Sequence, residues 1–241
     1  MLLRTGQLGG ARYALTDRYG GVSRPPFAEL NLGDHVGDDP TAVSENRRRL
    51  LAQLLGATRL ALMTQVHGQD VAVVTAGLAE DRPTADALVT ATPGVALAAL
   101  AADCVPVLLA GRVRPAVAAV HAGRRGVQSG VVGAAVAALN EQGVEPHELV
   151  ALVGPAVCGR CYEVPEAMVE LLATALPAAR STTRSGTPAL DLPAAVAAQL
   201  TAAGVTDVEV DPTCTVESEN LYSHRRDGVT GRVAGVVWLT A

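Results

Sequence analysis

The sequence contains no lysine: all 19 of its basic residues are arginine. This absence excludes a Schiff base with a carbonyl substrate and the phosphate-binding lysine of a P-loop, because both need an amine side chain. Aromatic residues make up only 2% of the chain, and the formal net charge is −5. A nucleic-acid-binding surface needs a basic face and stacking rings, so we expect no nucleic-acid partner.

Long hydrophobic runs are also missing. Residues 1–21 contain no apolar segment long enough for the core of a signal peptide. The longest apolar stretch, around residues 94–111, is interrupted by Asp103 and Pro106 and is too short to cross a bilayer. We therefore predict a cytoplasmic protein with no membrane partner, in which the four cysteines are reduced thiols or ligands and not disulfides.

Short apolar runs define the middle of the chain, at residues 95–101, 105–110 and 116–120. Valine-rich runs of this length, bounded by turn-forming residues, are typical of buried strands. No internal repeat or linker divides the sequence. We therefore predict one α/β (α+β) domain, residues 1–241, of mixed β-sheets flanked by helices. Further strands are expected at 11–16, 60–63, 69–75, 86–90, 149–153, 205–211 and 233–239, helices at 38–55, 127–142, 165–176 and 193–203, and a surface loop at 178–189.

Potential metal ligands lie at the ends of these runs. Cys104 follows the first run and His121 directly follows the third, just before a glycine-rich turn; His67 lies in a third polar turn. Two imidazoles and one thiolate match the open, catalytic kind of zinc site, which keeps its fourth position free. The same donors also suit one type of copper centre, so ligand chemistry alone leaves zinc and copper open.

Several arginines are candidate anion ligands. Arg124 and Arg125 lie where a helix begins, so backbone N–H groups and a guanidinium could converge on a phosphate. The alternative is a solvated pair. Arg225, Arg226 and Asp227 could likewise clamp a substrate or tie down their own loop by a salt bridge.

A CxxC pair, Cys158 and Cys161, is the other cysteine motif. A closed thiolate zinc site needs four ligands, and the sequence has no second CxxC to supply them. We therefore expect Cys158, Cys161 and Cys214 to be dispensable for metal binding, with Cys214 packed as a small apolar group.

Together these motifs resemble the YfiH family, also called laccase-domain or polyphenol-oxidase proteins. The likeness runs from about residue 12 to the C-terminus, and its HG…DCxPV…HAGxRG pattern is highly specific. One departure is Arg124, where the family usually has tryptophan. The matching segments are 20–23, 30–33, 36–40, 65–68, 85–86, 102–108, 121–126, 154–155, 162–164, 214–215 and 225–232.

The resemblance implies a mononuclear zinc site on His67, Cys104 and His121, and cleavage of purine nucleosides (adenosine, inosine and methylthioadenosine) by inorganic phosphate, with adenosine deamination. Cys104 and His121 would then be catalytic as well as metal-binding. We expect Arg125 and the start of the following helix to bind the phosphate, and the purine base to stack on Phe27 or Tyr222. As a general acid/base we expect Asp103, because it is the closest carboxylate in the sequence.

Three other functions stay open, and the resemblance itself suggests two of them, the editing of peptidoglycan precursors and copper-dependent phenol oxidation. A metal-free hydrolase could use Cys104 as nucleophile and His121 as base, which would suit amide cleavage in the editing of peptidoglycan precursors. Copper-dependent phenol oxidation is the second, although His35, His147 and His224 are too few to build a multinuclear copper cluster. A zinc-binding interaction module is the third, and the open three-ligand set argues against it.

Overall fold

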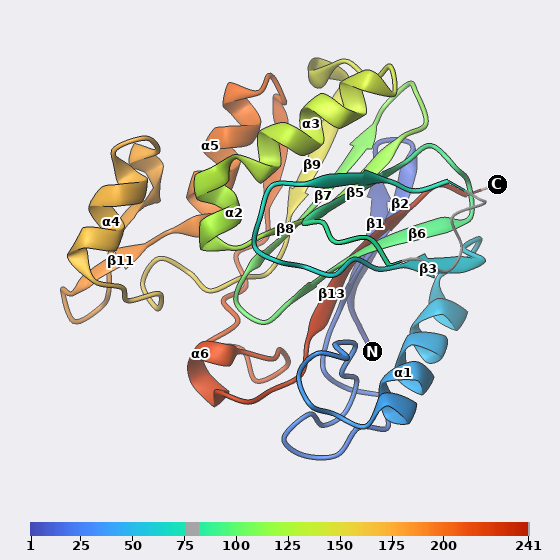
Figure 1. The fold of residues 1–241 in the computed structure, drawn as a ribbon, viewed down its shortest axis with the longest axis horizontal. Coiled ribbons are helices and arrows are strands. Elements are labelled where there is room, and N and C mark those ends of the chain that lie inside the picture. The colour runs from blue at the N-terminus through green and yellow to red at the C-terminus, as the bar shows by residue number, and fades with distance from the viewer. Residues whose placement is uncertain (76–81, 241) are drawn as a thin grey trace.

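Two large mixed sheets form the centre of the computed structural model, which describes residues 1–75 and 82–240 (Figure 1). The five-stranded sheet has the order β1 (Leu2–Leu8), β2 (Ala11–Thr16), β13 (Val233–Trp238), β6 (Val95–Ala101), β3 (Arg59–Ala61). The six-stranded sheet has the order β12 (Asp207–Val210), β9 (Leu149–Val153), β7 (Val105–Gly111), β8 (Val117–Ala122), β5 (Ala87–Thr90), β4 (Val71–Val73). A small antiparallel pair joins β10 (Arg180–Thr182) to β11 (Pro188–Leu190).

Helices cover the outer faces of both sheets, and the two sheets pack against each other, which gives four layers (Figure 1). The inter-sheet core includes Leu97 of β6 and Leu108 of β7, whereas Leu50 of α1 packs on the outer face of the five-stranded sheet. Both faces of the central strands are therefore buried, which is why they read as continuous apolar runs. The helices are α1 (Pro40–Gln53), α2 (Arg124–Ser129), α3 (Val131–Glu141), α4 (Glu166–Ala173), α5 (Leu192–Ala202) and α6 (His224–Asp227), with 3₁₀ turns at Pro146–Glu148 and Pro177–Ala179.

The structure confirms the predicted fold class and corrects several elements. The helix predicted at 127–142 is divided at Gly130, whose φ of 90° places it in the left-handed region. Residues 178–189 are not a loop, because β10 and most of β11 lie there. Strand β1 was not expected, and β8 continues to Ala122 by pairing with β7, so His121 lies within a strand and not after one. Among the described residues, no helix is long and apolar enough to span a membrane.

Candidate metal centre and pocket

The three side chains expected to bind a metal lie together at one end of the sheets. His67 comes from the segment between β3 and β4, Cys104 from the turn between β6 and β7, and His121 from β8. One ligand atom from each lies within 4.8 Å of the other two, and Cys104 Sγ is 3.8 Å from His67 Nε2. A tetrahedral zinc would hold a sulfur and a nitrogen ligand about 3.6 Å apart. A metal ion therefore fits between these groups with little movement.

Two strained backbone positions direct these side chains. His67 has a φ of 60°, and Asp103, next to the thiol, has a φ of 95°. Such left-handed conformations cost roughly 1–3 kcal/mol and persist only where neighbouring groups enforce them. For the His67 turn that group is Asp86, whose carboxylate accepts backbone N–H bonds from Val66 at 3.2 Å, His67 at 2.9 Å and Gly68 at 2.6 Å.

The same carboxylate also orients the second imidazole. Asp86 Oδ1 accepts a hydrogen bond from His121 Nδ1 at 2.8 Å, and both side chains are buried. With Nδ1 occupied in this way, Nε2 is the nitrogen left to bind a metal. Its position in the sequence alone does not predict this role for Asp86. The available signal was a charged residue at the start of an otherwise apolar strand.

Two glycines of the HAGRRG segment are required by close packing at this site. A Cβ at Gly123 would lie 2.7 Å from His67 Cδ2 and 3.1 Å from Cys104 Sγ. A Cβ at Gly126 would lie 3.0 Å from the carbonyl oxygen of Gly68. The motif therefore needs glycine at both positions, because the turn that carries His67 packs closely against the start of α2.

Cys104 and His121 form a strongly polarised pair. Burial disfavours the Cys104 thiolate, but the neighbouring His121 and His67 outweigh this effect and lower the pKa of Cys104 to about 6. Burial likewise disfavours the charged imidazole, but the Cys104 thiolate and Asp86 together raise the pKa of His121 to about 9. Near neutral pH the pair is thus a thiolate and an imidazolium, and the thiolate is the form that both metal binding and nucleophilic attack require.

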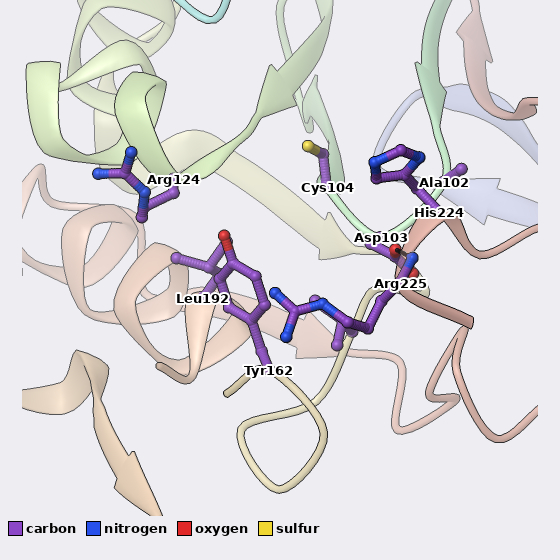
Figure 2. Close-up of a pocket in the computed structure, with 9 residues that line it drawn as sticks. Ala102, Asp103, Cys104, Arg124, Tyr162, Leu192, His224 and Arg225 are labelled. Carbon is purple, nitrogen blue, oxygen red and sulfur yellow. Dashed lines mark hydrogen bonds between the residues drawn. The ribbon is translucent and has the colours of Figure 1, made fainter. Parts of the chain in front are cut away.

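A pocket opens beside the thiol (Figure 2). Tyr162 points into it between Arg124 and Arg225, with Cys104 and His224 on the opposite side. Its lining is mixed in character, with two guanidinium groups, one aromatic ring and several apolar side chains. The lining residues are Ala102, Asp103, Cys104, Arg124, Val157, Tyr162, Leu192, His224 and Arg225.

Asp103 holds one wall of this pocket in place. Its carboxylate accepts hydrogen bonds from Thr215 Oγ1 and from the backbone N–H of Arg225, both at 2.6 Å. The Arg225 guanidinium lies 5.0 Å from the centre of the Tyr162 ring and donates to the Glu163 carbonyl at 2.7 Å. The carboxylate that the sequence offered as a general acid/base is therefore engaged in positioning Arg225.

The other expected substrate contacts are placed differently. Arg125 is exposed and is not one of the lining residues, whereas its neighbour Arg124 is. Stacking of a base on Phe27 or Tyr222 is wrong: both are buried, and the Tyr222 hydroxyl donates to the Phe27 carbonyl at 2.7 Å. Tyr162 is the aromatic residue in the pocket.

Arg226 ties down its own loop, as one of the two interpretations of this motif held. Its guanidinium pairs with Asp227 at 2.7 Å and donates to the carbonyl oxygens of Thr215 at 2.9 Å and Ser218 at 2.8 Å. Of the two adjacent arginines, only Arg225 lines the pocket.

A second group of potential ligands lies elsewhere in the fold. Cys158 and Cys161 meet Cys214 and Glu217, with one ligand atom from each within 4.8 Å of the others. All four cysteines of the protein are free thiols. The sequence predicts that Cys158, Cys161 and Cys214 are dispensable for metal binding, because no second CxxC is present. The structure nevertheless places Cys214 and Glu217, from a segment more than fifty residues away, beside the CxxC pair.

Comparison with known proteins adds independent information. Residues 12–240 match the family described as multi-copper polyphenol oxidoreductase laccase. The chain is 54% identical over 234 residues to a protein of Streptomyces griseus named purine nucleoside phosphorylase ORF3, covering 96% of this chain and 95% of that protein. It is 38% identical over 233 residues to the purine nucleoside phosphorylase YfiH of Shigella flexneri, covering 95% and 94%.

Solved structures show the same fold. A crystal structure of a Neisseria meningitidis protein superposes with a TM-score of 0.90 at 38% identity, covering 99% of both chains. That of YlmD from Geobacillus stearothermophilus gives a TM-score of 0.89 at 37% identity, covering 97% of this chain and 93% of the other. The likeness extends over the whole length of each pair.

Proposed function

This chain belongs to the YfiH family of laccase-domain proteins, and we propose on that premise that it is a zinc-dependent purine nucleoside phosphorylase that also deaminates adenosine. The observation that carries the proposal is the convergence of His67, Cys104 and His121 beside a pocket that holds two guanidinium groups and one aromatic ring. Its relatives in Streptomyces griseus and Shigella flexneri are named for the same phosphorolytic activity.

The donor set suits zinc in an open coordination sphere. Three protein ligands with nitrogen and sulfur donors leave a fourth position for water or substrate. When bound, zinc would supply a Lewis acid and lower the pKa of its bound water to about 7. Asp86 supports this assignment, because a carboxylate that orients a ligating imidazole is the usual partner of a zinc-bound histidine.

In phosphorolysis an oxygen of inorganic phosphate forms a bond to C1′ of the ribose, while the bond from C1′ to the purine nitrogen breaks and its electron pair leaves with the base. The products are ribose 1-phosphate and the free base, which takes up a proton. Arg124 and Arg225 face the pocket, and bidentate guanidinium groups are well suited to hold the phosphate dianion. Tyr162 lies between them and offers its ring to the base.

Deamination would use the same pocket without phosphate. Water adds at purine C6 and ammonia leaves, so that adenosine becomes inosine. Asp103 is engaged by Thr215 and Arg225 and is a positioning residue in this scheme.

The ionised Cys104 and His121 pair favours a second candidate function, a metal-free cysteine hydrolase acting on amides of peptidoglycan precursors.

Copper-dependent phenol oxidation finds less support. A multinuclear copper centre needs more imidazoles than His67 and His121, and within the described part of the chain no further histidine joins their cluster. Chemistry at a single copper ion bound to His67, Cys104 and His121 is distinguished from zinc chemistry by measuring which metal the active protein contains.

The test is turnover of adenosine by zinc-loaded protein, with and without inorganic phosphate. We expect adenine and ribose 1-phosphate only when phosphate is present, inosine in either case, and loss of both activities on chelation with recovery when zinc returns. His67→Ala and Cys104→Ser should lose the metal of this site and the activity together. His147→Ala removes an exposed histidine far from the cluster in sequence and serves as the matched control.

Three results would contradict the proposal. Full turnover of adenosine by zinc-free protein, abolished by alkylation of Cys104, would show that Cys104 acts as a nucleophile and not as a zinc ligand. Adenine release without phosphate would make the enzyme a nucleoside hydrolase. Recovery of activity with copper but not with zinc would favour the oxidase chemistry.

A further inference from the structure

We propose that Cys158, Cys161, Cys214 and Glu217 bind a second zinc ion, which is structural and separate from the one at His67. The three sulfur atoms and a carboxylate oxygen all lie within 4.8 Å of one another. A zinc ion with bonds of about 2.3 Å to sulfur holds two thiolates about 3.8 Å apart. The four donors are therefore near tetrahedral spacing before any metal binds, and this cluster shares no residue with the first.

The CxxC pair has the turn expected of a metal-binding knuckle. The backbone N–H groups of Cys161 and Tyr162 both donate to the Cys158 carbonyl, at 2.9 Å and 3.0 Å. Gly159, inside the turn, has no room for a side chain, because a Cβ there would lie 2.6 Å from Ser181 Oγ and 2.8 Å from Asp191 Cβ. The turn is thus held against β10 and the start of α5, with both thiols facing Cys214.

The third thiol arrives on a separate segment that is fixed to the first by its backbone. Ala156 and Cys214 form a parallel β-bridge, and the Thr215 N–H donates to the Ala156 carbonyl at 3.0 Å. The Cys158 N–H points at Cys214 Sγ, 3.4 Å away. Cys214 itself is only 6% exposed, so this ligand is shielded from water.

A neighbouring arginine would offset part of the charge of the occupied site. Zinc binding would replace the protons of three thiols, and the product, one Zn²⁺ with three thiolates and one carboxylate, carries a charge of −2. Arg184 already forms an ion pair with Glu217 and offsets part of that charge. Cys161 Sγ donates to Glu217 Oε1 at 3.2 Å, and metal binding would replace this proton.

The donor types select the metal and its role. Soft thiolate ligands favour zinc among the common divalent ions, and four protein ligands leave no open position for a substrate. The ion would join the segment that carries Val157 to the segment that carries Thr215. Both segments contact Asp103, through the Val157 N–H at 3.0 Å and Thr215 Oγ1 at 2.6 Å. The second zinc would therefore brace the wall of the pocket.

The decisive experiment is zinc content per chain, measured by elemental analysis of protein purified with a thiol reductant and desalted. We expect two zinc ions in the wild type and one in each of Cys161→Ser and Cys104→Ser. The Cys104→Ser/Cys161→Ser double variant should hold none. Glu217→Gln should keep two ions but lose the second to a chelator more readily, and Arg160→Gln, which changes a residue inside the knuckle that is not a ligand, should keep both.

Wild-type protein also tests the site directly, should a variant fail to fold. Cobalt(II) in place of zinc should give the intense near-ultraviolet sulfur-to-metal absorption of a three-thiolate site, and all four thiols should resist titration until the metal is removed. One zinc per chain with three reactive thiols would overturn the proposal. So would a mass two daltons low, because it would show that two of these cysteines form a disulfide. Neither result bears on the activity proposed for the first site.

Discussion

Asp86 and His121 meet through a buried hydrogen bond of 2.8 Å between Oδ1 and Nδ1, which orients one of the candidate metal ligands. The same carboxylate closes the His67 turn through three backbone N–H groups. One side chain thus positions two of the three candidate ligands.

Asp86→Asn should weaken zinc binding by about 10- to 100-fold. The carboxylate accepts four hydrogen bonds, and an amide would present an NH₂ group to donors on one side. Affinity is measured by competition with a chromogenic chelator. Asp70→Asn, on an exposed neighbour in the same segment, is the control and should bind zinc normally. Equal affinity in both variants would contradict this role.

Gly123→Ala should abolish metal binding at the His67, Cys104 and His121 site, because the new methyl group would lie 2.7 Å from His67 and 3.1 Å from Cys104. Gly133→Ala is the matched change on α3, where a Cβ would meet no atom within 4 Å. That control should raise the free energy of unfolding by about 0.5–1 kcal/mol and leave zinc content unchanged. Thermal unfolding and metal analysis of the two variants measure both effects. Zinc content in Gly123→Ala equal to that of the wild type would refute the packing argument.

Zinc binding at the first site should release about one proton from the Cys104 and His121 pair at pH 7.5. With pKa values of about 6 for Cys104 and about 9 for His121, the metal-free pair holds its single proton on the imidazole. Zinc affinity should therefore rise about tenfold per pH unit between about pH 6 and 9, and more steeply below 6, where the thiol is protonated too. Calorimetry in buffers of different ionisation enthalpy, using Cys161→Ser to isolate this site, counts the protons. Release of none would contradict the ion-pair assignment.

Arg124→Gln should raise the KM for phosphate by about tenfold or more, since a charge-assisted hydrogen bond contributes about 1.5–3 kcal/mol. Arg125→Gln should change it by less than about twofold, because that side chain is exposed and does not line the pocket. Steady-state kinetics with varied phosphate compares the two neighbours. A larger increase in the KM for phosphate in Arg125→Gln than in Arg124→Gln would instead support Arg125, the residue favoured by the sequence, as the phosphate ligand.

Tyr162→Leu should raise the KM for adenosine by about tenfold, because stacking of a base on an aromatic ring contributes about 1–3 kcal/mol. Tyr222→Phe should leave that KM unchanged and lower the free energy of unfolding by about 1 kcal/mol, since it removes only the buried bond to Phe27. A nucleoside titration at saturating phosphate separates the two tyrosines, and an unchanged KM in Tyr162→Leu would exclude stacking on this ring.

The sequence by itself determined the elements whose causes are local. The apolar runs around residues 95–120 predict buried strands because a chain covered on both faces needs no polar positions. Cys104 and His67 stand at turns that interrupt such runs, and their chemistry and motif spacing indicated a shared metal. The division of the helix at Gly130 is also local, but a single glycine within a helical pattern is tolerated too often to predict it.

Only the tertiary structure decided contacts between segments distant in the chain. Nothing near Asp86 shows that it will face His121, because their side chains meet through the pairing of β5 with β8. Because Tyr222 lies in a polar loop of the sequence, its ring was expected to be accessible to a purine base. In the fold it is buried against Phe27 and does not line the pocket. Cys214 reaches Cys158 and Cys161 because backbone pairing at Ala156 fixes the two segments side by side. The local sequence pattern predicts the helix, strand or turn in which a residue lies. The packing of whole elements against one another decides which residues come into contact.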